Sequence, residues 1–302
     1  MNTFDLQIQS TASDGKHTPR EIVGMARDLK LPVIALTDHD TVSGVEEALA
    51  ASREYGVGVI PGIEMSVEDY GSHILGFGVD YHDKILLDEL EKFKQGRIDG
   101  AKKMVENLRA AGFAIEWDDV LRQSTGAVIA RPHIARAILN RAENKAKLQG
   151  IATSHDFILK YLTDESPYYA RRAHISAKDA IALIHEARGV AVWSHPVIHF
   201  RDDYEALEKF LQQLLGWGMD GLEIFNPSHS EDDAEFIESM SVKYGMLRTA
   251  GSDFHEKKSH ARDDKGMHSA DTLGDYETYG FATDDILPKL DEAMQKRAVA
   301  IK

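Results

Sequence analysis

The sequence predicts an α/β fold: a barrel of alternating strands and helices that is interrupted by a helical insertion. Short apolar runs alternate with helical patterns over most of the 302 residues, and long helical runs replace this alternation between about residues 84 and 173. Such alternation implies a parallel sheet, and seven or eight strand–helix repeats imply a barrel. An open doubly wound sheet would show a similar pattern and stays an alternative.

Seven apolar segments have the length of strands and are bounded by turn or helix signals. They cover residues 4–9, 33–36, 59–64, 73–79, 190–194, 221–225 and 247–250. Helical patterns lie between them. Thr18 and Pro19 open the first helix as its cap and first residue, and Gly56 and Gly189 end the helices over 45–55 and 177–188. Two more patterns cover residues 204–215 and 232–244.

The segment over residues 84–173 departs from the alternation. Its long helical patterns, at 87–111, 132–147 and 156–162, indicate an inserted helical subdomain. The barrel domain is therefore predicted to comprise residues 1–83 and 174–302. A helical insertion above the carboxyl-terminal face of a barrel would close the site and recognise substrate.

The composition narrows the class of protein. A net charge of −15 argues against a broad basic surface for extended duplex nucleic acid, although a local pocket for an anionic substrate is compatible with it. No run of about 18 apolar residues predicts a membrane span, and no signal pattern opens the chain. The absence of cysteine excludes disulfides and thiolate ligands and favours the cytoplasm. We therefore expect a cytoplasmic protein without a membrane partner, and leave its oligomeric state open.

Polar side chains recur directly at the ends of the predicted strands, whose carboxyl ends meet at one mouth of a barrel, and His73 stands at the start of its apolar run. The candidate metal ligands in these six segments are Asp14, His39, Glu64, His73, His195, Asp253 and His255. Imidazole and carboxylate together suit Zn, Mn or Fe, and several carboxylates indicate more than one ion. Each segment alone is typical of an ordinary turn, Thr-Asp-His-Asp at 37–40 being one example. Six such segments in barrel order predict a metal centre.

Gln7 and Gln9 lie at the end of the first predicted strand. Alternate residues of a strand point to the same side, so both side chains should converge on the same mouth. An amide oxygen is a harder ligand than an imidazole nitrogen. A site built from two amide oxygens and carboxylates would therefore favour Mg or Mn over Zn.

Six motifs follow one another between Phe4 and about His255: Ser-Asp-Gly, Thr-Asp-His-Asp, Pro-Gly-Ile-Glu, His-Ile-Leu-Gly, Ser-His-Pro and Gly-Ser-Asp-Phe-His. In this order they resemble the polymerase and histidinol phosphatase (PHP) superfamily. Within it, the chain is similar to stand-alone phosphoesterases that remove phosphate from 3′,5′-nucleoside bisphosphates or trim short RNA from the 5′ end. The resemblance implies a distorted (β/α)7 barrel that holds two or three metal ions at its carboxyl-terminal face.

The resemblance also implies which ligands share a metal. Glu64 would bridge two ions, and His73 and His195 would join it at one site. A second site would consist of Asp14, His39 and His255.

A third site would combine Asp253 with the residues at positions 7 and 9. The family has His-x-His where this chain has Gln7-Ile8-Gln9. Three interpretations follow: the site holds an ion weakly, it stays empty while two metals remain elsewhere, or the change is an inactivation, natural or engineered.

A further set of residues is predicted to hold substrate phosphate. The family's insertion carries Arg-Pro-His, which Arg131, Pro132 and His133 match, and the planar fork of arginine pairs with two phosphate oxygens. A helix start at Pro132 with a solvated Arg131 is the alternative. Asn226 and His229, in Asn-Pro-Ser-His after a strand, are further candidates, with a plain Asn-Pro turn as the alternative.

The predicted function is hydrolysis of a phosphate ester on a small nucleotide or at the end of a short RNA. His195, His255 and Asp253 are the predicted catalytic residues, with His195 or His255 protonating the leaving oxygen. Two or three divalent ions are the predicted cofactor, Mn first, with Mg, Zn and Fe open. Gln7 and Gln9 put the activity of this chain in question. The alternatives are a histidinol-phosphatase-like enzyme, a phosphate-binding protein without turnover, and a plain structural barrel.

Overall fold

The computed structural model describes residues 2–123, 129, 131–163, 165–170, 175–201, 203–256 and 270–299. The chain divides into two compact units: Met1–Asp88 with Ile175–Lys302, here called the barrel unit, and Glu89–His174, here called the helical unit. The first boundary falls inside helix α3 (Lys84–Ala110). The division into functional domains after residues 83 and 173 stays a prediction.

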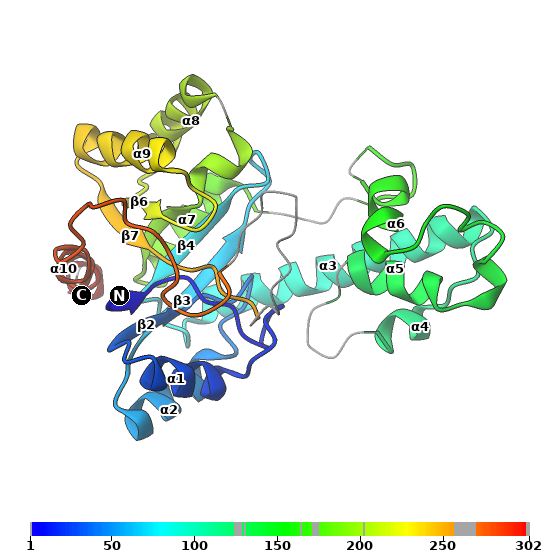
Figure 1. Ribbon diagram of the computed structural model, residues 1–302, viewed down its shortest axis with the longest axis horizontal. Coiled ribbons are helices and arrows are strands. Elements are labelled where there is room, and N and C mark those ends of the chain that lie inside the picture. Colours follow the sequence, from blue (N-terminus) through cyan, green and yellow to red (C-terminus); the bar gives the residue numbers. More distant parts are fainter. Residues whose placement is uncertain are drawn as a thin grey trace. The chain divides into compact units, whose positions relative to one another are not determined.

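A seven-stranded sheet forms the barrel unit. Its strands are β1 (Phe4–Asp5), β2 (Val33–Leu36), β3 (Gly58–Ser66), β4 (His73–Phe77), β5 (Val190–Ser194), β6 (Gly221–Phe225) and β7 (Leu247–Ala250). Each strand pairs with its neighbour in the chain, in the order β1 to β7. The Leu6 N–H donates to the Ala250 carbonyl oxygen (3.1 Å) and links the first strand region to the last. The sheet is a nearly closed barrel flanked by helices (Figure 1), which confirms the predicted fold and excludes the doubly wound alternative.

Two strand pairings are antiparallel, so the expectation of a parallel sheet is wrong for β4. This strand runs antiparallel to both β3 and β5, whereas the other described pairs are parallel. Only residues 67–72 connect β3 to β4, a length that turns the chain back but cannot carry a crossover helix. The beginning of β4 consequently lies beside the ends of β3 and β5, where His73 pairs with Ser66 and Ser194.

The first strand is shorter than predicted, since β1 ends at Asp5 instead of Gln9. The Asp5 side chain accepts the Gln7 N–H (3.3 Å) and so takes a donor that a strand ladder would use. Beyond this point Ile8 forms an isolated parallel bridge with Phe254, and the Ile8 carbonyl oxygen accepts the Thr37 N–H (3.0 Å). The segment therefore stays in the barrel wall, and Gln7 and Gln9 are fully buried there.

Helices cover the outside of the strands. Those at predicted positions are α1 (Pro19–Asp28), α2 (Val45–Tyr55), α7 (Ala177–Glu186), α8 (Tyr204–Gly216) and α9 (Glu231–Tyr244). A reciprocal capping box of Thr18 and Glu21 begins α1, and Gly56 ends α2 with a left-handed backbone (φ 72°). In Figure 1, α1 with α2 and α8 with α9 lie on opposite sides of the strands. Helix α10 (Ile286–Val299) is absent from the sequence-based prediction.

The helical unit continues α3 and adds short helices around a core of its own. These are α4 (Trp117–Leu121), α5 (Arg131–Leu139), the 3-10 helix η1 (Ala142–Asn144) and α6 (Ser154–Tyr161). The predicted helix over 132–147 is wrong beyond Leu139. Buried Asn144 is the reason, because its side-chain amide donates to the Ile138 carbonyl oxygen (2.9 Å) and holds the chain in a turn there. Within the described ranges, no helix is both long and apolar enough to cross a bilayer.

Candidate metal centre

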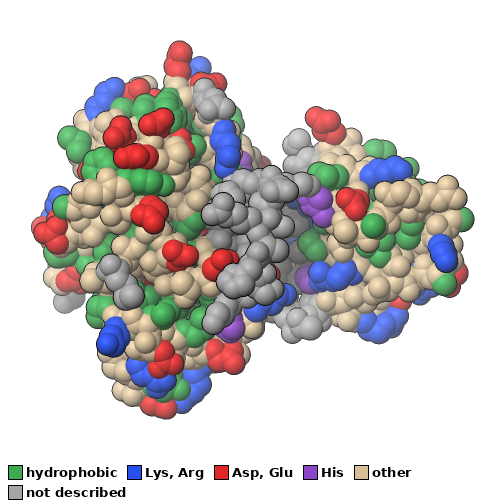
Figure 2. Space-filling model, in the orientation of Figure 1, with side chains coloured by type: hydrophobic (Ala, Val, Ile, Leu, Met, Phe, Trp, Pro, Cys, Tyr) green, Lys and Arg blue, Asp and Glu red, His purple; other side chains and the backbone are tan. Residues whose placement is uncertain are grey.

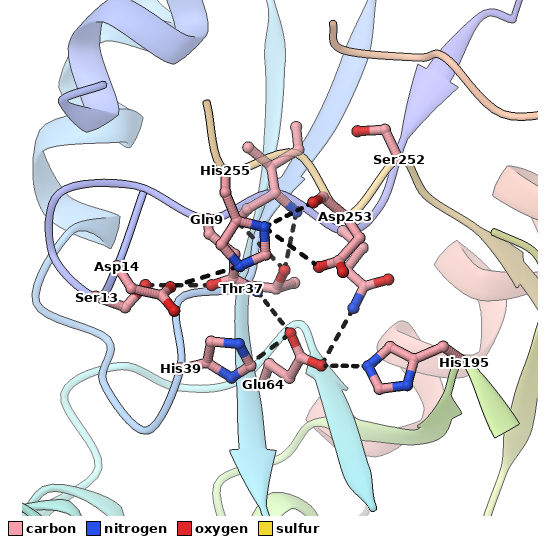
Figure 3. Close-up of polar contacts among 12 residues, drawn as sticks. Gln9, Ser13, Asp14, Thr37, His39, Glu64, His195, Ser252, Asp253 and His255 are labelled. Carbon is pink, nitrogen blue, oxygen red and sulfur yellow. Dashed lines mark hydrogen bonds and ion pairs between the residues drawn. The ribbon is translucent and has the colours of Figure 1, made fainter. Parts of the chain in front are cut away.

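The polar segments that follow the strands meet at one end of the barrel unit. His39 follows β2, His195 follows β5, and Asp253 and His255 follow β7. His73 opens β4, and because β4 is antiparallel to its neighbours this position lies at the same end. Figure 3 shows His39, His195, Asp253 and His255 gathered around Glu64.

The carboxylate of Glu64 lies at the centre of the cluster and is fully buried. Its Oε1 is 3.0 Å from His73 Nδ1 and 3.2 Å from His195 Nε2. Its Oε2 is 3.8 Å from His39 Nδ1. Burial alone would raise the pKa of Glu64, but the neighbouring imidazoles of His39 and His73 and the hydrogen bond of His195 lower this pKa well below its usual range. Glu64 is therefore an ionised acceptor surrounded by three imidazoles.

Two overlapping groups of side chains have the spacing of metal ligands. One is His39, Glu64 and His73, the other is Asp14, His39 and His255, and the ligand atoms within each group lie within 4.8 Å of one another. Burial lowers the pKa of His39 to about 4, so its imidazole is neutral near pH 7 and offers a lone pair to a cation. Since His39 belongs to both groups and a neutral imidazole offers a single lone pair, His39 can serve a cation in only one of the two groups at a time.

His255 has the hydrogen bonding typical of a metal-binding histidine. Its Nδ1–H donates to the Asp253 carbonyl oxygen (2.7 Å), which directs Nε2 toward Asp14, 3.6 Å from Oδ1. Asp253 has a backbone φ of 51°, and His195 has a φ of 29°, in a region that non-glycine residues rarely adopt. Strained backbone of this kind concentrates at functional sites.

The Asp253 carboxylate lies beside these groups without belonging to either of the two ligand-spaced sets found among the described residues. Its Oδ1 is 3.8 Å from His255 Nδ1. Burial raises the pKa of Asp253 to about 6, against the charge of His255, which lowers it. The structure thus brings Asp253 into the centre, next to the ligands.

The side chains of Gln7 and Gln9 converge on Glu64. Gln7 Nε2 lies 3.1 Å from Glu64 Oε1. Gln9 Nε2 lies 2.6 Å from Glu64 Oε2 (Figure 3). Each glutamine therefore turns an N–H group toward one oxygen of the central carboxylate.

The predicted phosphate-binding pair Arg131 and His133 lies at the start of α5, in the helical unit. The Arg131 guanidinium donates to the Leu162 carbonyl oxygen (3.1 Å) and stands over the Tyr169 ring, 5.5 Å from its centroid. These contacts fix the direction of the Arg131 side chain within the helical unit.

Asn226 and His229 belong to the barrel unit and are buried. The Asn226 amide donates to Gln7 Oε1 (3.0 Å) and to Glu223 Oε2 (3.1 Å), so both of its N–H groups are used inside the protein. His229 donates Nδ1–H to the Ile224 carbonyl oxygen (2.8 Å). Burial lowers the pKa of His229 to about 4, which makes this histidine neutral near pH 7.

Two buried carboxyl groups of the centre escape the sequence analysis. Glu223 Oε2 accepts the His195 N–H (2.8 Å) and so supports the strained backbone there, and burial raises the pKa of Glu223 well above its usual range. Asp5 accepts the Ser252 N–H (2.9 Å) and holds the loop that carries Asp253. The sequence did contain a signal for both residues: each is acidic within a predicted strand, and a buried strand position is rarely acidic without a role.

The residues present fit a divalent cation in either of two overlapping groups and do not fit one around positions 7 and 9. His39 Nδ1 is buried and has no hydrogen-bond partner in the described part of the chain. Buried imidazole nitrogens normally have partners, and a cation is the partner that an imidazole and carboxylate set would supply. Around positions 7 and 9, in contrast, N–H donors and not oxygen atoms face Glu64.

A seven-stranded α/β barrel with a histidine and carboxylate cluster at one end defines the class of protein as a candidate metal-binding barrel. Comparison with known families is more specific: the PHP domain model matches residues 5–217, and this chain belongs to the PHP family.

Individual relatives agree with this membership. The chain is 31% identical over 266 residues to a 3′,5′-nucleoside bisphosphate phosphatase of Chromobacterium violaceum, a match that covers 87% of this chain and 90% of that protein. It is 28% identical over 254 residues to a 5′-3′ exoribonuclease of Haemophilus influenzae, covering 83% of this chain and 89% of that protein. A solved structure from Bifidobacterium adolescentis, provisionally assigned as a metal-dependent phosphoesterase, matches with a TM-score of 0.75 at 29% identity over 96% of both chains.

Proposed function

We propose that this chain is a metal-dependent phosphoesterase that hydrolyses a phosphate ester of a small nucleotide, such as a 3′,5′-nucleoside bisphosphate, or of the 5′ end of a short RNA. The observation that carries the proposal is the pair of ligand groups that share His39. The two enzymes named above act on such substrates, and each is similar to this chain over more than four fifths of its length. Neither of them supports the histidinol phosphatase alternative.

The proposed cofactor is a divalent cation, with Mn first and Mg, Zn or Fe as alternatives. Asp14, His39, Glu64, His73 and His255 would hold it, whereas His195 and Asp253, which the sequence also predicts as ligands, lie outside the two ligand groups found among the described residues. A divalent ion in such a site lowers the pKa of water toward neutrality and offsets the charge of phosphoryl oxygens.

The chain's own residues orient this site and supply the proton. His255 uses Nδ1–H on the Asp253 carbonyl oxygen and turns Nε2 toward Asp14, so both of its nitrogens are engaged. We assign protonation of the leaving oxygen to His195, whose Nε2 lies 3.2 Å from both Glu64 Oε1 and His73 Nδ1. Asp253 acts by holding the His255 ring in its orientation.

The charge of the helical unit supports a polyanionic substrate. Lys and Arg outnumber Asp and Glu there by 15 to 11, whereas the whole chain has 35 against 50. Figure 2 shows Lys and Arg side chains at several points on the visible face of this unit. A basic surface raises the local concentration of phosphorylated ligands. Arg131 and His133, which we propose as phosphate contacts, belong to the same unit.

An activity panel with a ligand variant tests the proposal. Substrates are adenosine 3′,5′-bisphosphate, a short 5′-phosphorylated RNA and histidinol phosphate, each with and without Mn²⁺. We expect turnover of one of the first two that EDTA abolishes and Mn²⁺ restores. Glu64→Gln should lower kcat/KM by about 100-fold or more, as removal of a metal-site group does. Glu68→Gln, on the exposed surface of the same region, is the matched control.

Two results would overturn the proposal. Metal-loaded protein that hydrolyses none of the three substrates would favour the binding protein without turnover. Activity on histidinol phosphate alone would favour that enzyme class instead.

A further inference from the structure

The structure defines which amide atom of Gln7 faces Glu64. The backbone N–H of Ser228 decides this, because it can only donate a hydrogen bond. The Ser228 N–H donates to Asn226 Oδ1 (2.9 Å), so the amide nitrogen of Asn226 lies on the other side and donates to Gln7 Oε1 (3.0 Å). The Nε2 of Gln7 is consequently the atom that faces Glu64 Oε1 (3.1 Å). Exchange of the two Gln7 amide atoms would set N–H against N–H at Asn226.

Gln9 lies between Ser13 and Glu64. Its Nε2 donates to Glu64 Oε2 (2.6 Å), and its Oε1 is 3.2 Å from the Ser13 hydroxyl. Both oxygens of the buried carboxylate are thus paired with amide N–H groups.

We propose that Gln7 and Gln9 take the place of one cation in the centre: they hold the Glu64 carboxylate with one N–H donor on each oxygen. An amide nitrogen has no lone pair available for a cation, so positions 7 and 9 are not ligands. The two groups that share His39 keep their ligands. This inference rests on the proposed function in one respect only: the cations are taken to be the cofactor of the proposed phosphoesterase.

A consequence is that the centre is formed before any ion binds. Glu64 is fully buried, and a buried carboxylate without donors would be strongly destabilising. The hydroxyl of Ser194 lies between the two side chains, accepting from Gln7 Nε2 (2.9 Å) and donating to Glu64 Oε1 (3.2 Å). These donors compensate the charge of Glu64 in the metal-free protein.

Metal content tests the first part of the proposal. Wild type, Gln7→His/Gln9→His and a control, Gln149→His/Gln213→His, are dialysed against Mn²⁺ and analysed for ions bound per chain. The control adds two histidines at exposed positions. We expect Gln7→His/Gln9→His to bind one more ion per chain than wild type, and the control to bind as many as wild type. Equal ion counts in wild type and Gln7→His/Gln9→His would overturn the proposal.

A second variant tests the hydrogen bonds and does not depend on the folding of the double mutant. Gln9→Met keeps the length of the side chain but removes both the N–H donor and the amide oxygen, and its soft thioether is a poor ligand for Mn²⁺. In EDTA its Tm should fall by roughly 5 °C, the shift expected for one lost hydrogen bond to a buried charge in a unit of this size. It should gain no metal. An unchanged Tm in EDTA would show that the amide does not support Glu64 and would overturn the proposal.

These readouts separate the inference from the proposed function. If ion counts and Tm values behave as expected but the metal-loaded protein hydrolyses none of the three substrates, the proposed function is wrong and the role of the glutamines stands. If hydrolysis is found but wild type binds as many ions as Gln7→His/Gln9→His, the proposed function stands and the role of the glutamines is wrong.

Discussion

The aromatic cluster of the helical unit permits a prediction with a worked magnitude. Phe157 on α6 is fully buried, and its ring centroid lies 5.6 Å from that of Phe113 and 4.9 Å from that of Tyr161. Phe157→Ala removes these contacts and leaves a cavity, which costs about 3–5 kcal/mol. A unit the size of residues 89–174 has a total stability of about 4–13 kcal/mol. The substitution therefore removes a large share of the stability of the helical unit.

The assay is differential scanning calorimetry of the full chain. Because each unit has its own core, we expect separate transitions for the helical unit and the barrel unit. Phe157→Ala should lower the Tm of the helical unit by about 12 °C or more, at about 4–8 °C per kcal/mol, and leave the other transition in place. Leu159→Ala is the matched control on the same helix, since Leu159 is 56% exposed and its loss should cost less than about 0.5 kcal/mol.

Two outcomes would refute this reasoning. A single transition that Phe157→Ala shifts as a whole would mean that the two units unfold together. Equal effects of Phe157→Ala and Leu159→Ala would mean that α6 does not turn Phe157 into the core.

Two further predictions concern the barrel unit. Gly251→Ala would place a Cβ 2.6 Å from the backbone nitrogen of Gln7. We therefore expect the free energy of unfolding in urea to fall by about 3 kcal/mol, together with reduced metal binding. Gly216→Ala is the control, because its Cβ would meet no atom within 4 Å, and it should be neutral or slightly stabilising. Equal effects of the two substitutions would contradict this. Arg297→Ala removes an ion pair with Asp220 (2.7 Å) that is worth about 1 kcal/mol. Burial opposes ionisation of Asp220, but its hydrogen bonds outweigh burial and lower its pKa below 3.8. The stability that ionised Asp220 adds is therefore present above pH 3.8 and is lost as the pH falls through the lower pKa of the folded protein. The difference from wild type in urea unfolding should therefore shrink below pH 3.8, and a difference that does not change with pH would count against the ion pair.

Much of the fold could be predicted from local sequence patterns. Apolar runs place all seven strands, and cap residues such as Thr18 and Gly56 place the helix ends, because both signals act over a few neighbouring residues. The same patterns missed α10 and extended α5 too far. The end of α5 depends on Asn144, whose side-chain amide donates to the Ile138 carbonyl oxygen and also pairs with the backbone of Ala114, 30 positions away in the chain.

The candidate site divides in the same way. The sequence by itself determined which residue types follow the strands, and with them the chemistry of imidazole and carboxylate. Only the tertiary structure decided that β4 is antiparallel, which brings His73 to the end of the barrel where His195 lies. It also revealed Glu223, whose strand looks apolar but whose carboxyl group supports the backbone of His195.

The two glutamines show the physical reason most clearly. The sequence determined that Gln7 and Gln9 reach the centre, because side-chain direction along an extended segment is a local property. Whether each presents an oxygen or an N–H group depends on the partners of both amide atoms. Asn226 is one of these partners and lies 219 positions away in the chain. That choice decides between a cation ligand and a hydrogen-bond donor, and it exists only in the folded barrel.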